Sequence, residues 1–289
     1  MDDSYKEVRA TGFDALTLAT SLLQRARLAD PLAGVWEAAD VQWWWRRPQR
    51  SDQVEQVFWL DDDGPVAGIL LTGSADDTWQ CDPVVVPAVL GLEPDLVWSR
   101  ALEHVSEHAA TGFSVPVSDQ GGFEKVARTS GLSPDYRDST GWMDASDRPA
   151  VSPPVDGFFL LDRTQRVDVP HHMRDRSGDS VQQRLEQCSL YDAGLDLVVE
   201  TAEGQVAGYS LYWFDPTTKV GLVEPVRVED EFQRRGLASA MLTAGIERLV
   251  ARGAERVKVS YGSEAAAGTY RGVGFQPTST TTWYRQPDG

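Results

Sequence analysis

The residues best placed to do chemistry lie where a strand-like run meets a helical pattern in the second half of the chain. Val220–Val228 is rich in β-branched residues, and the apolar residues from Leu237 onward repeat as on one helix face. Between them stands Gln233-Arg234-Arg235-Gly236-Leu237-Ala238. A glycine-bearing turn before a helix exposes backbone N–H groups at the positive end of the helix dipole. Such a turn, beside two arginines, predicts a phosphate-binding site.

The same loop resembles the pyrophosphate loop of the GNAT superfamily of N-acetyltransferases. The family pattern Gln/Arg-x-x-Gly-x-Gly/Ala is matched by Gln233, Gly236 and Ala238. Upstream, the run from Glu224 to Val228 resembles the family's fourth strand, which leads into that loop. Downstream, the Tyr-x-x-x-Gly-Phe signature of the family is matched by Tyr270-Arg271-Gly272-Val273-Gly274-Phe275. The resemblance implies an acyl-CoA fold for this half and acetyl-CoA as the acyl donor, with no metal.

The resemblance also implies which residues hold the acyl donor. Two neighbouring strands are expected to splay apart, so that the pantetheine arm lies in the gap against strand backbone. A backbone N–H near Val228 is expected to hold the oxyanion. Where the family often has asparagine, seven residues before the tyrosine, this chain has Ser263. The expected cofactor-binding residues are Val226, Arg227, Val228, Gln233, Arg234, Arg235, Gly236, Leu237, Ala238, Ser239, Ser263 and Tyr270.

Two side chains are candidates for proton transfer. Direct attack of an amine on a thioester needs a base for the amine and an acid for the departing thiolate. Glu224 is expected to be the base, and Tyr270 is expected to be the acid. The alternatives are structural: Glu224 as a solvated strand residue or a partner of Arg227, and Tyr270 as a tyrosine packed in the core with its hydroxyl at the edge.

The chain repeats itself with a period near 140 residues. The acidic-glycine hairpin around Gly64 parallels the one around Gly204, 140 residues later. Asp82-Pro83-Val84 parallels Glu224-Pro225-Val226, and Gly131-Leu132 parallels Gly274-Phe275. We therefore expect two copies of one α/β domain, over residues 1–146 and 155–289, joined by a proline- and serine-containing linker near 144–154.

The first copy is expected to be degenerate. Pro87 and Pro94 flank its strand-to-helix connection, which lacks the Gln-x-x-Gly-x-Ala pattern. Glu93 and Asp95 stand where a phosphate would have to dock. Residues 1–146 are therefore expected not to bind acyl-CoA, and to shape the substrate cleft or support the active half.

The elements expected in the second half follow from its periodicity. Strands are expected at Phe158–Asp162, Asp196–Thr201, 206–214, Val220–Val228, 257–261 and 278–284, and helices within 171–187 and at 235–252 and Glu264–Gly272. The resulting fold class is α/β, with a mixed, mostly antiparallel sheet, one splayed parallel pair and flanking helices.

Trp43-Trp44-Trp45-Arg46-Arg47 is the most unusual local composition. Adjacent indoles and arginines could line a cation- or sugar-binding cleft. The favoured interpretation is structural, with alternate tryptophans buried in the N-terminal core.

Composition narrows the function classes. The 289 residues carry a formal net charge of −17, from 27 basic and 44 acidic residues. This charge argues against nucleic acid and permits cationic substrates such as amines. The alternative, which we favour, is that the acidic surface simply keeps the protein in solution. We expect no membrane span, no secretion signal, reduced core thiols at Cys81 and Cys188, no metal site at His171-His172, and a cytoplasmic location.

The expected function is N-acetyl transfer from acetyl-CoA to a primary amine of a small molecule, by a monomer or homodimer. Two alternatives stay open. One is acetylation of a protein or peptide amine. The other is a non-catalytic acyl-CoA sensor in which Glu224 and Tyr270 are only structural.

Overall fold

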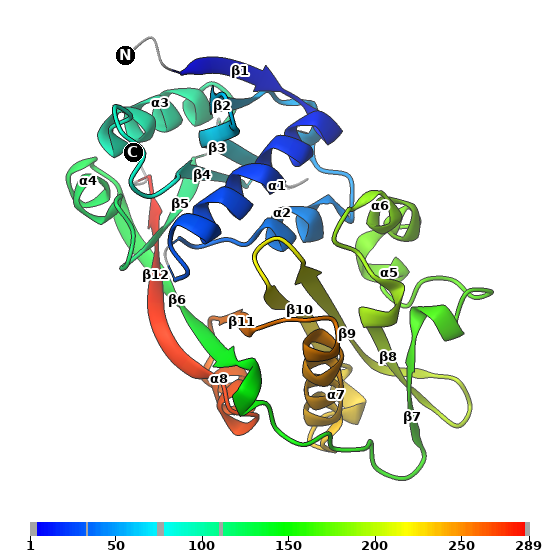
Figure 1. Cartoon of the computed structure of the whole chain (residues 1–289). Helices are drawn as coiled ribbons and strands as arrows, with labels where there is room; N and C mark the ends of the chain where they lie inside the picture. The colour runs from blue at the N-terminus through cyan, green and yellow to red at the C-terminus, as the bar shows by residue number, and fades with distance from the viewer. Residues whose placement is uncertain (1–4, 33, 74–77, 110–111, 287–289) are drawn as a thin grey trace. The chain divides into compact units, whose positions relative to one another are not determined.

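The structure is a computed structural model that describes residues 5–32, 34–73, 78–109 and 112–286. It is a mixed α/β protein in which helices flank sheets of parallel and antiparallel strands (Figure 1). None of the helices in the described ranges is both long and apolar enough to cross a membrane.

The two halves of the chain contain the same succession of elements. The first half contains β1 (Lys6–Ala10), α1 (Gly12–Ala29), α2 (Ala38–Trp45), β2 (Gln56–Asp61), β3 (Gly64–Gly73), β4 (Trp79–Val85), α3 (Pro94–Ser106), β5 (Phe113–Ser118), α4 (Glu124–Thr129) and β6 (Ser133–Asp144). The second half contains β7 (Phe158–Asp162), α5 (Arg174–Ser177), α6 (Val181–Gln187), β8 (Asp196–Thr201), β9 (Val206–Asp215), β10 (Val220–Val228), α7 (Leu237–Ala251), β11 (Arg256–Tyr261), α8 (Glu264–Gly272) and β12 (Gln276–Arg285). The strands expected in the second half all form, with ends that differ by at most two residues.

The chain forms two compact units, and the last strand of each half of the sequence lies in the unit that the other half mainly forms. Unit 1 consists of Met1–Val41, Pro48–Asp138 and Ser279–Gly289, and unit 2 of Gln42–Arg47 and Ser139–Thr278. In unit 1 the strands lie in the order β1-β2-β3-β4-β5-β12, and in unit 2 in the order β7-β8-β9-β10-β11-β6. A division of the chain at residues 146–155, as expected from the sequence, differs from these units. The reason is that β12 pairs antiparallel with β5, and β6 pairs antiparallel with β11.

Unit 1 is built around a sheet with helices on both faces. Alternate residues of β2 face opposite ways, so Val57 and Trp59 join the apolar cluster that includes Trp98 of α3. On the other face, α1 lies so close to β3 that a side chain at Gly68 would meet Leu22 and Phe58. Glycine is therefore required at this contact.

In unit 2, helix α7 packs against β9 and β10 and covers one face of the sheet (Figure 1). The ring of Tyr212 lies directly under Gly245, where a Cβ atom would come within 2.0 Å of it. The Tyr212 hydroxyl donates a hydrogen bond of 2.7 Å to the Met241 carbonyl. This close approach holds α7, and with it the loop that precedes the helix, at a fixed distance from the sheet.

Candidate functional site

Strands β10 and β11 of unit 2 separate soon after they meet. Their parallel register covers only Val220–Leu222 on β10 against Arg256–Lys258 on β11, although both strands continue. On its other side, β10 pairs with β9, and this register shifts between Val223 and Val226. The bulge redirects the strand, and the edge of β10 that leaves β11 can offer backbone groups to a ligand.

The loop after β10 has the geometry of an anion site. Gly236 is the N-cap of α7 and adopts a left-handed conformation, with φ of +78°. A Cβ atom here would meet nothing within 4 Å, so the glycine is needed for its backbone conformation, and the space above it is open. The first amides of α7, at Leu237, Ala238 and Ser239, have no partner inside the helix. Together with the helix dipole they favour a phosphate group.

These features open into one cavity of about 630 Å³ in unit 2. Nine of the residues expected to bind the acyl donor line it: Val226, Val228, Gln233, Arg234, Gly236, Leu237, Ala238, Ser239 and Tyr270. The structure therefore brings the splayed strand, the loop and α8 together at one place.

One wall of this cavity was not predicted from the sequence. It is made by α8, through Ala265, Ala266, Gly268 and Thr269, all of which have small side chains. The sequence feature that indicates this wall is the run of small residues Ala265-Ala266-Ala267-Gly268 before Tyr270. Small side chains let a ligand approach the helix closely.

Three residues expected to bind the acyl donor lie outside the lining. Arg227 forms an ion pair with Glu229, with Nε 3.1 Å from Oε1, because strand alternation turns it away from the face that holds Val226 and Val228. The Arg235 guanidinium lies 5.9 Å from the ring centre of Phe232. Their contact with a ligand stays a prediction.

Ser263, the third of these residues, caps α8. Its Oγ accepts a hydrogen bond of 3.2 Å from the Ala266 N–H. The serine at the position of the family's asparagine thus fixes the start of the helix that carries Tyr270.

The ring of Tyr270 packs against two other aromatic rings. The ring centres of Tyr261 and Phe275 lie 5.5 Å and 5.9 Å from that of Tyr270. Burial raises the pKa of the Tyr270 hydroxyl, and the negative charge of Glu224 raises it further. The phenol therefore keeps its proton at neutral pH and can act as a donor.

Glu224 lies at the bulge of β10 and is half-buried. Its carbonyl oxygen accepts a hydrogen bond of 2.9 Å from the Nε1 of Trp213, and the peptide bond to Pro225 is cis. The backbone at the bulge is therefore held by a buried indole.

Arg46 brings a positive charge to this region of unit 2. Burial lowers the pKa of its guanidinium to about 10, with Arg47 lowering it further, whereas the charges of Glu224 and Tyr209 raise it. The guanidinium carbon lies 3.6 Å from the ring centre of Trp43. Arg46 still remains charged at neutral pH, so it can attract an anionic group near Glu224.

The expectation that the tryptophan run belongs to the N-terminal core was wrong. The three tryptophans end helix α2, and Gln42–Arg47 groups with unit 2 and not with the N-terminal core. Trp45 donates a hydrogen bond of 2.9 Å to Gln187, while Arg184 lies over its ring. The tryptophan run belongs to unit 2 because Trp45 makes these contacts with residues of α6.

The adjacent histidines of unit 2 belong to a buried polar network. The Nδ1 of His171 accepts a hydrogen bond from the Met173 N–H, so its Nε2 carries the proton and donates to Asp196 at 2.9 Å. Tyr191 donates to the same carboxylate, and His172 lies 2.9 Å from its other oxygen. Although burial acts to raise the pKa of Asp196, the two histidines lower it. The network fixes the segment before α5 against β8.

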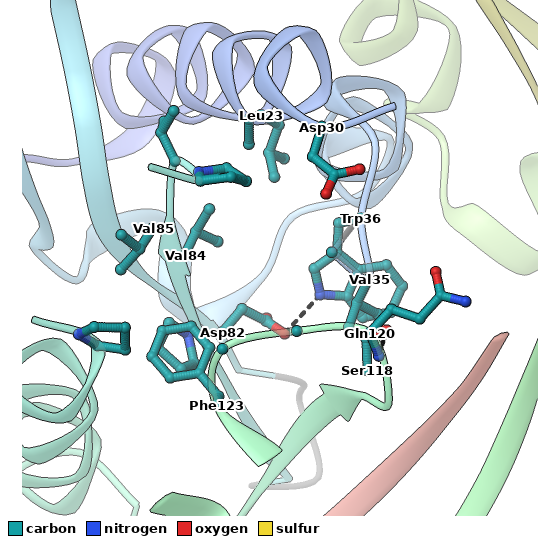
Figure 2. A pocket seen from close by; sticks show the side chains of 18 of the residues that line it. Leu23, Asp30, Val35, Trp36, Asp82, Val84, Val85, Ser118, Gln120 and Phe123 are labelled. Atoms are coloured by element: carbon teal, nitrogen blue, oxygen red, sulfur yellow. Dashed lines mark hydrogen bonds between the residues drawn. The ribbon is translucent and has the colours of Figure 1, made fainter. Parts of the chain in front are cut away.

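The corresponding region of unit 1 has a different lining. The parallel register of β4 and β5 covers only Trp79 and Gln80, so these strands also separate. A cavity of about 440 Å³ lies there, walled mainly by apolar residues of β4 and of the segment that follows it. Figure 2 shows the Trp36 indole facing the Asp82 carboxylate at this cavity.

Asp82, the counterpart of Glu224 in the repeat, is fully enclosed. Its carboxylate accepts hydrogen bonds from Trp36 Nε1 at 2.7 Å and from Gln80 Nε2 at 2.8 Å. Burial nevertheless raises its pKa to about 7. The folded protein therefore takes up a proton here at a pH where the unfolded chain, with a pKa near 3.9, has lost it.

This difference predicts a pH-dependent loss of stability. Between about pH 4 and 7 the folded state binds more protons at Asp82, so its stability falls as pH rises. The Asp82→Asn variant mimics the protonated form, and we expect it to gain about 2 kcal/mol relative to wild type between pH 5 and pH 8. Urea unfolding at several pH values measures the gain. The exposed Asp135→Asn control should show none, and a pH-independent difference for Asp82→Asn would contradict the assignment.

Residues 161–275 match the model of the acetyltransferase (GNAT) family, and they contain the strands, loop and helices of the site. This part of the chain is therefore a GNAT acetyltransferase domain. Over 134 residues, the chain is 31% identical to a mycothiol acetyltransferase of Clavibacter michiganensis subsp. michiganensis. The match covers 46% of this chain and 42% of that protein, so the chain matches less than half of its relative.

Solved structures resemble the whole chain in fold. A tandem GNAT protein from the clavulanic acid biosynthesis pathway superposes with a TM-score of 0.68 at 14% identity, over 99% of each chain. A GCN5-related N-acetyltransferase from Sphaerobacter thermophilus gives a TM-score of 0.60 at 18% identity, over 99% of this chain and 96% of that one. At these identities the likeness concerns the fold alone.

Proposed function

We propose that unit 2 transfers an acetyl group from acetyl-CoA directly to a primary amine of a small molecule. The observation that carries this proposal is the cavity of about 630 Å³, which the anion-binding loop, the separated edge of β10 and Tyr270 share. A diphosphate would bind the first amides of α7, and the pantetheine arm would lie along the edge of β10.

The chemistry needs no enzyme nucleophile, because a thioester is already activated. The amine nitrogen attacks the thioester carbonyl, the C–N bond forms and the C–S bond breaks. The bound ammonium first releases one proton to solvent, which gives the nitrogen the lone pair that attacks. Glu224 takes the second proton as the C–N bond forms, and the Tyr270 hydroxyl protonates the departing thiolate and regains its proton from solvent. A strand N–H near Val228 stabilises the oxyanion. Holding the amine beside the thioester would lower the entropic part of the barrier. Glu224 itself is not among the residues that line the cavity.

The charge of the chain favours an amine as acceptor. At neutral pH a primary amine is mostly a cation, and a net charge of −17 attracts cations. Small-molecule amines, including aminoglycosides and amino acids, are therefore the first acceptors to test, followed by peptide amines.

Turnover tests the proposal. The purified chain is incubated with acetyl-CoA and each amine, and free thiol is followed with a chromogenic thiol reagent. Amine-dependent thiol release is expected for at least one small molecule. Release only with peptides would favour a protein acetyltransferase. Binding of acetyl-CoA without release for any amine would favour the sensor.

Glu224→Gln tests the base. The variant keeps the size of the side chain but cannot accept the amine proton, so we expect kcat to fall about 100-fold. The exposed Glu231→Gln on the neighbouring loop is the control and should keep the wild-type rate. If Glu224→Gln turned over at the wild-type rate with unchanged pH dependence, another group would have to be the base.

A further inference from the structure

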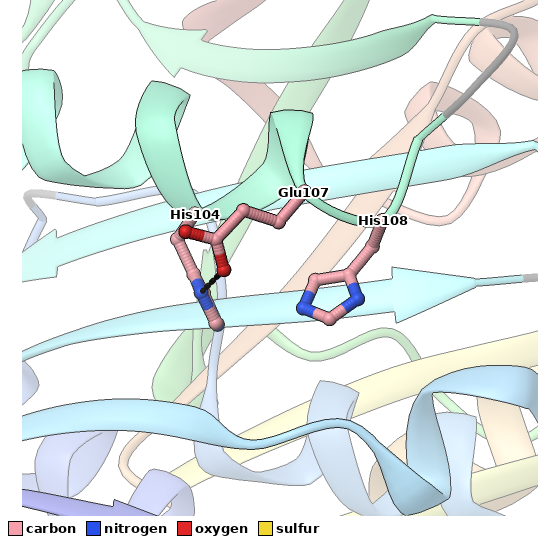
Figure 3. A group of neighbouring side chains, drawn as sticks. All are labelled: His104, Glu107 and His108. Carbon is pink, nitrogen blue, oxygen red and sulfur yellow. Dashed lines mark ion pairs between the residues drawn. The ribbon is translucent and has the colours of Figure 1, made fainter.

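Unit 1 carries a second group of chemically competent side chains, at the end of α3. His104, Glu107 and His108 lie three and four positions apart, so they project from one side of the helical turn (Figure 3). Helix α3 ends at Ser106, and the next two residues continue as a turn. One donor atom from each of the three side chains lies within 4.8 Å of the others.

His104 is oriented as a metal ligand would be. The side chain is 2% exposed, and its Nε2 lies 2.7 Å from the carbonyl oxygen of Glu55. A carbonyl only accepts hydrogen bonds, so Nε2 carries the proton, and Nδ1 presents its lone pair. Metal-binding histidines have this arrangement, in which a backbone carbonyl fixes the ring and its tautomer.

The other two donors lie beside that lone pair. The Glu107 carboxylate oxygen is 3.9 Å from His104 Nδ1, and its side chain is 62% exposed and can move. The ring centre of His108 is 5.3 Å from that of His104, and its ring stacks on Trp79 at 5.9 Å. Donors around a tetrahedral ion lie about 3.3–3.5 Å apart, since each bond is about 2.0–2.2 Å long. Small rotations of Glu107 and His108 would reach that spacing.

We propose that His104, Glu107 and His108 bind a divalent transition-metal ion, for which Zn²⁺ is the best fit. Two imidazoles and one carboxylate are a donor set that Zn²⁺ accepts, with water in the fourth position. The ion would join the end of α3 to the segment at Glu55, through the His104 ring, and to β4, through His108 on Trp79. The site concerns unit 1 and is independent of acyl transfer in unit 2.

Zinc binding by the full chain tests the proposal. The protein is freed of metal with a chelator, and Zn²⁺ is titrated in competition with a chromogenic indicator. Wild type should bind one equivalent at this site. Glu107→Gln and His108→Ala should each weaken that binding at least tenfold. These variants are chosen because His104 is buried and its replacement risks unfolding.

Glu103→Gln is the matched control, because this exposed glutamate lies one turn earlier on α3 and faces Arg100. It should bind zinc as wild type does. A second readout is the thermal unfolding midpoint, which Zn²⁺ should raise in wild type and Glu103→Gln but not in His108→Ala. The proposal is overturned by a lack of saturable binding in wild type. It is equally overturned if either ligand variant keeps wild-type affinity, since all three ligands are required.

Discussion

Replacing Gly236 by glutamate is expected to lower the affinity for coenzyme A at least a hundredfold, or about 2.7 kcal/mol. A non-glycine residue at φ of +78° costs about 1–2 kcal/mol. The new carboxylate would also project into the open space above the loop, where the diphosphate is proposed to bind. Calorimetry with desulfo-coenzyme A, which cannot react, measures the affinity directly.

Gly204→Glu is a matched control for this substitution. Gly204 has φ of +83°, and a Cβ atom there would also meet nothing within 4 Å. It lies in the turn between β8 and β9, so the variant has the same backbone strain and the same added charge. Its affinity should stay at the wild-type value. If Gly236→Glu bound desulfo-coenzyme A as tightly as Gly204→Glu, the loop would not be the diphosphate site.

Tyr270→Phe is expected to reduce kcat about 100-fold and to leave the affinity for desulfo-coenzyme A nearly unchanged. Only the hydroxyl is removed, while the ring contacts with Tyr261 and Phe275 remain. Because burial holds the Tyr270 pKa above its ordinary value, the hydroxyl is protonated throughout the neutral range and donates to the thiolate. Steady-state kinetics with a saturating amine, together with calorimetry, separates turnover from binding.

Tyr261→Phe serves as its control, because the Tyr261 ring packs against Tyr270 but lies on β11 outside the cavity lining. It should retain most of the wild-type kcat. A Tyr270→Phe variant with near-normal turnover would eliminate the hydroxyl as proton donor. A loss shared equally by the two variants would instead indicate a packing role for this aromatic pair.

The elements of the second half of the sequence could be predicted because their signals are local. β-branched residues over Val220–Val228 and apolar spacing from Leu237 onward each follow from the geometry of one strand or one helix. The turn at Gly236 was also evident, since a helix that starts after a glycine needs few distant contacts. The site residues that could be predicted from the sequence are therefore mainly residues that lie close together along the chain.

The functional residues that could not be predicted from the sequence depend on contacts between segments that are distant along the chain. The metal ligands proposed at α3 show this well, because the spacing of His104, Glu107 and His108 is in the sequence, yet we predicted no metal site. Only the fold puts the Glu55 carbonyl against His104 and Trp79 against His108.

The sequence by itself determined the two-fold repeat, the strands and main helices of the second half, and the glycine turn before α7. The strand, helix and turn signals act over a few residues, because hydrophobic spacing, β-branching and glycine are local properties of the chain. The tertiary structure decided which strand completes each unit, with β12 pairing with β5 and β6 with β11. It also decided that Arg46 lies near Glu224 and that α8 walls the cavity. Those outcomes depend on packing between segments that are distant along the chain, which no local pattern specifies.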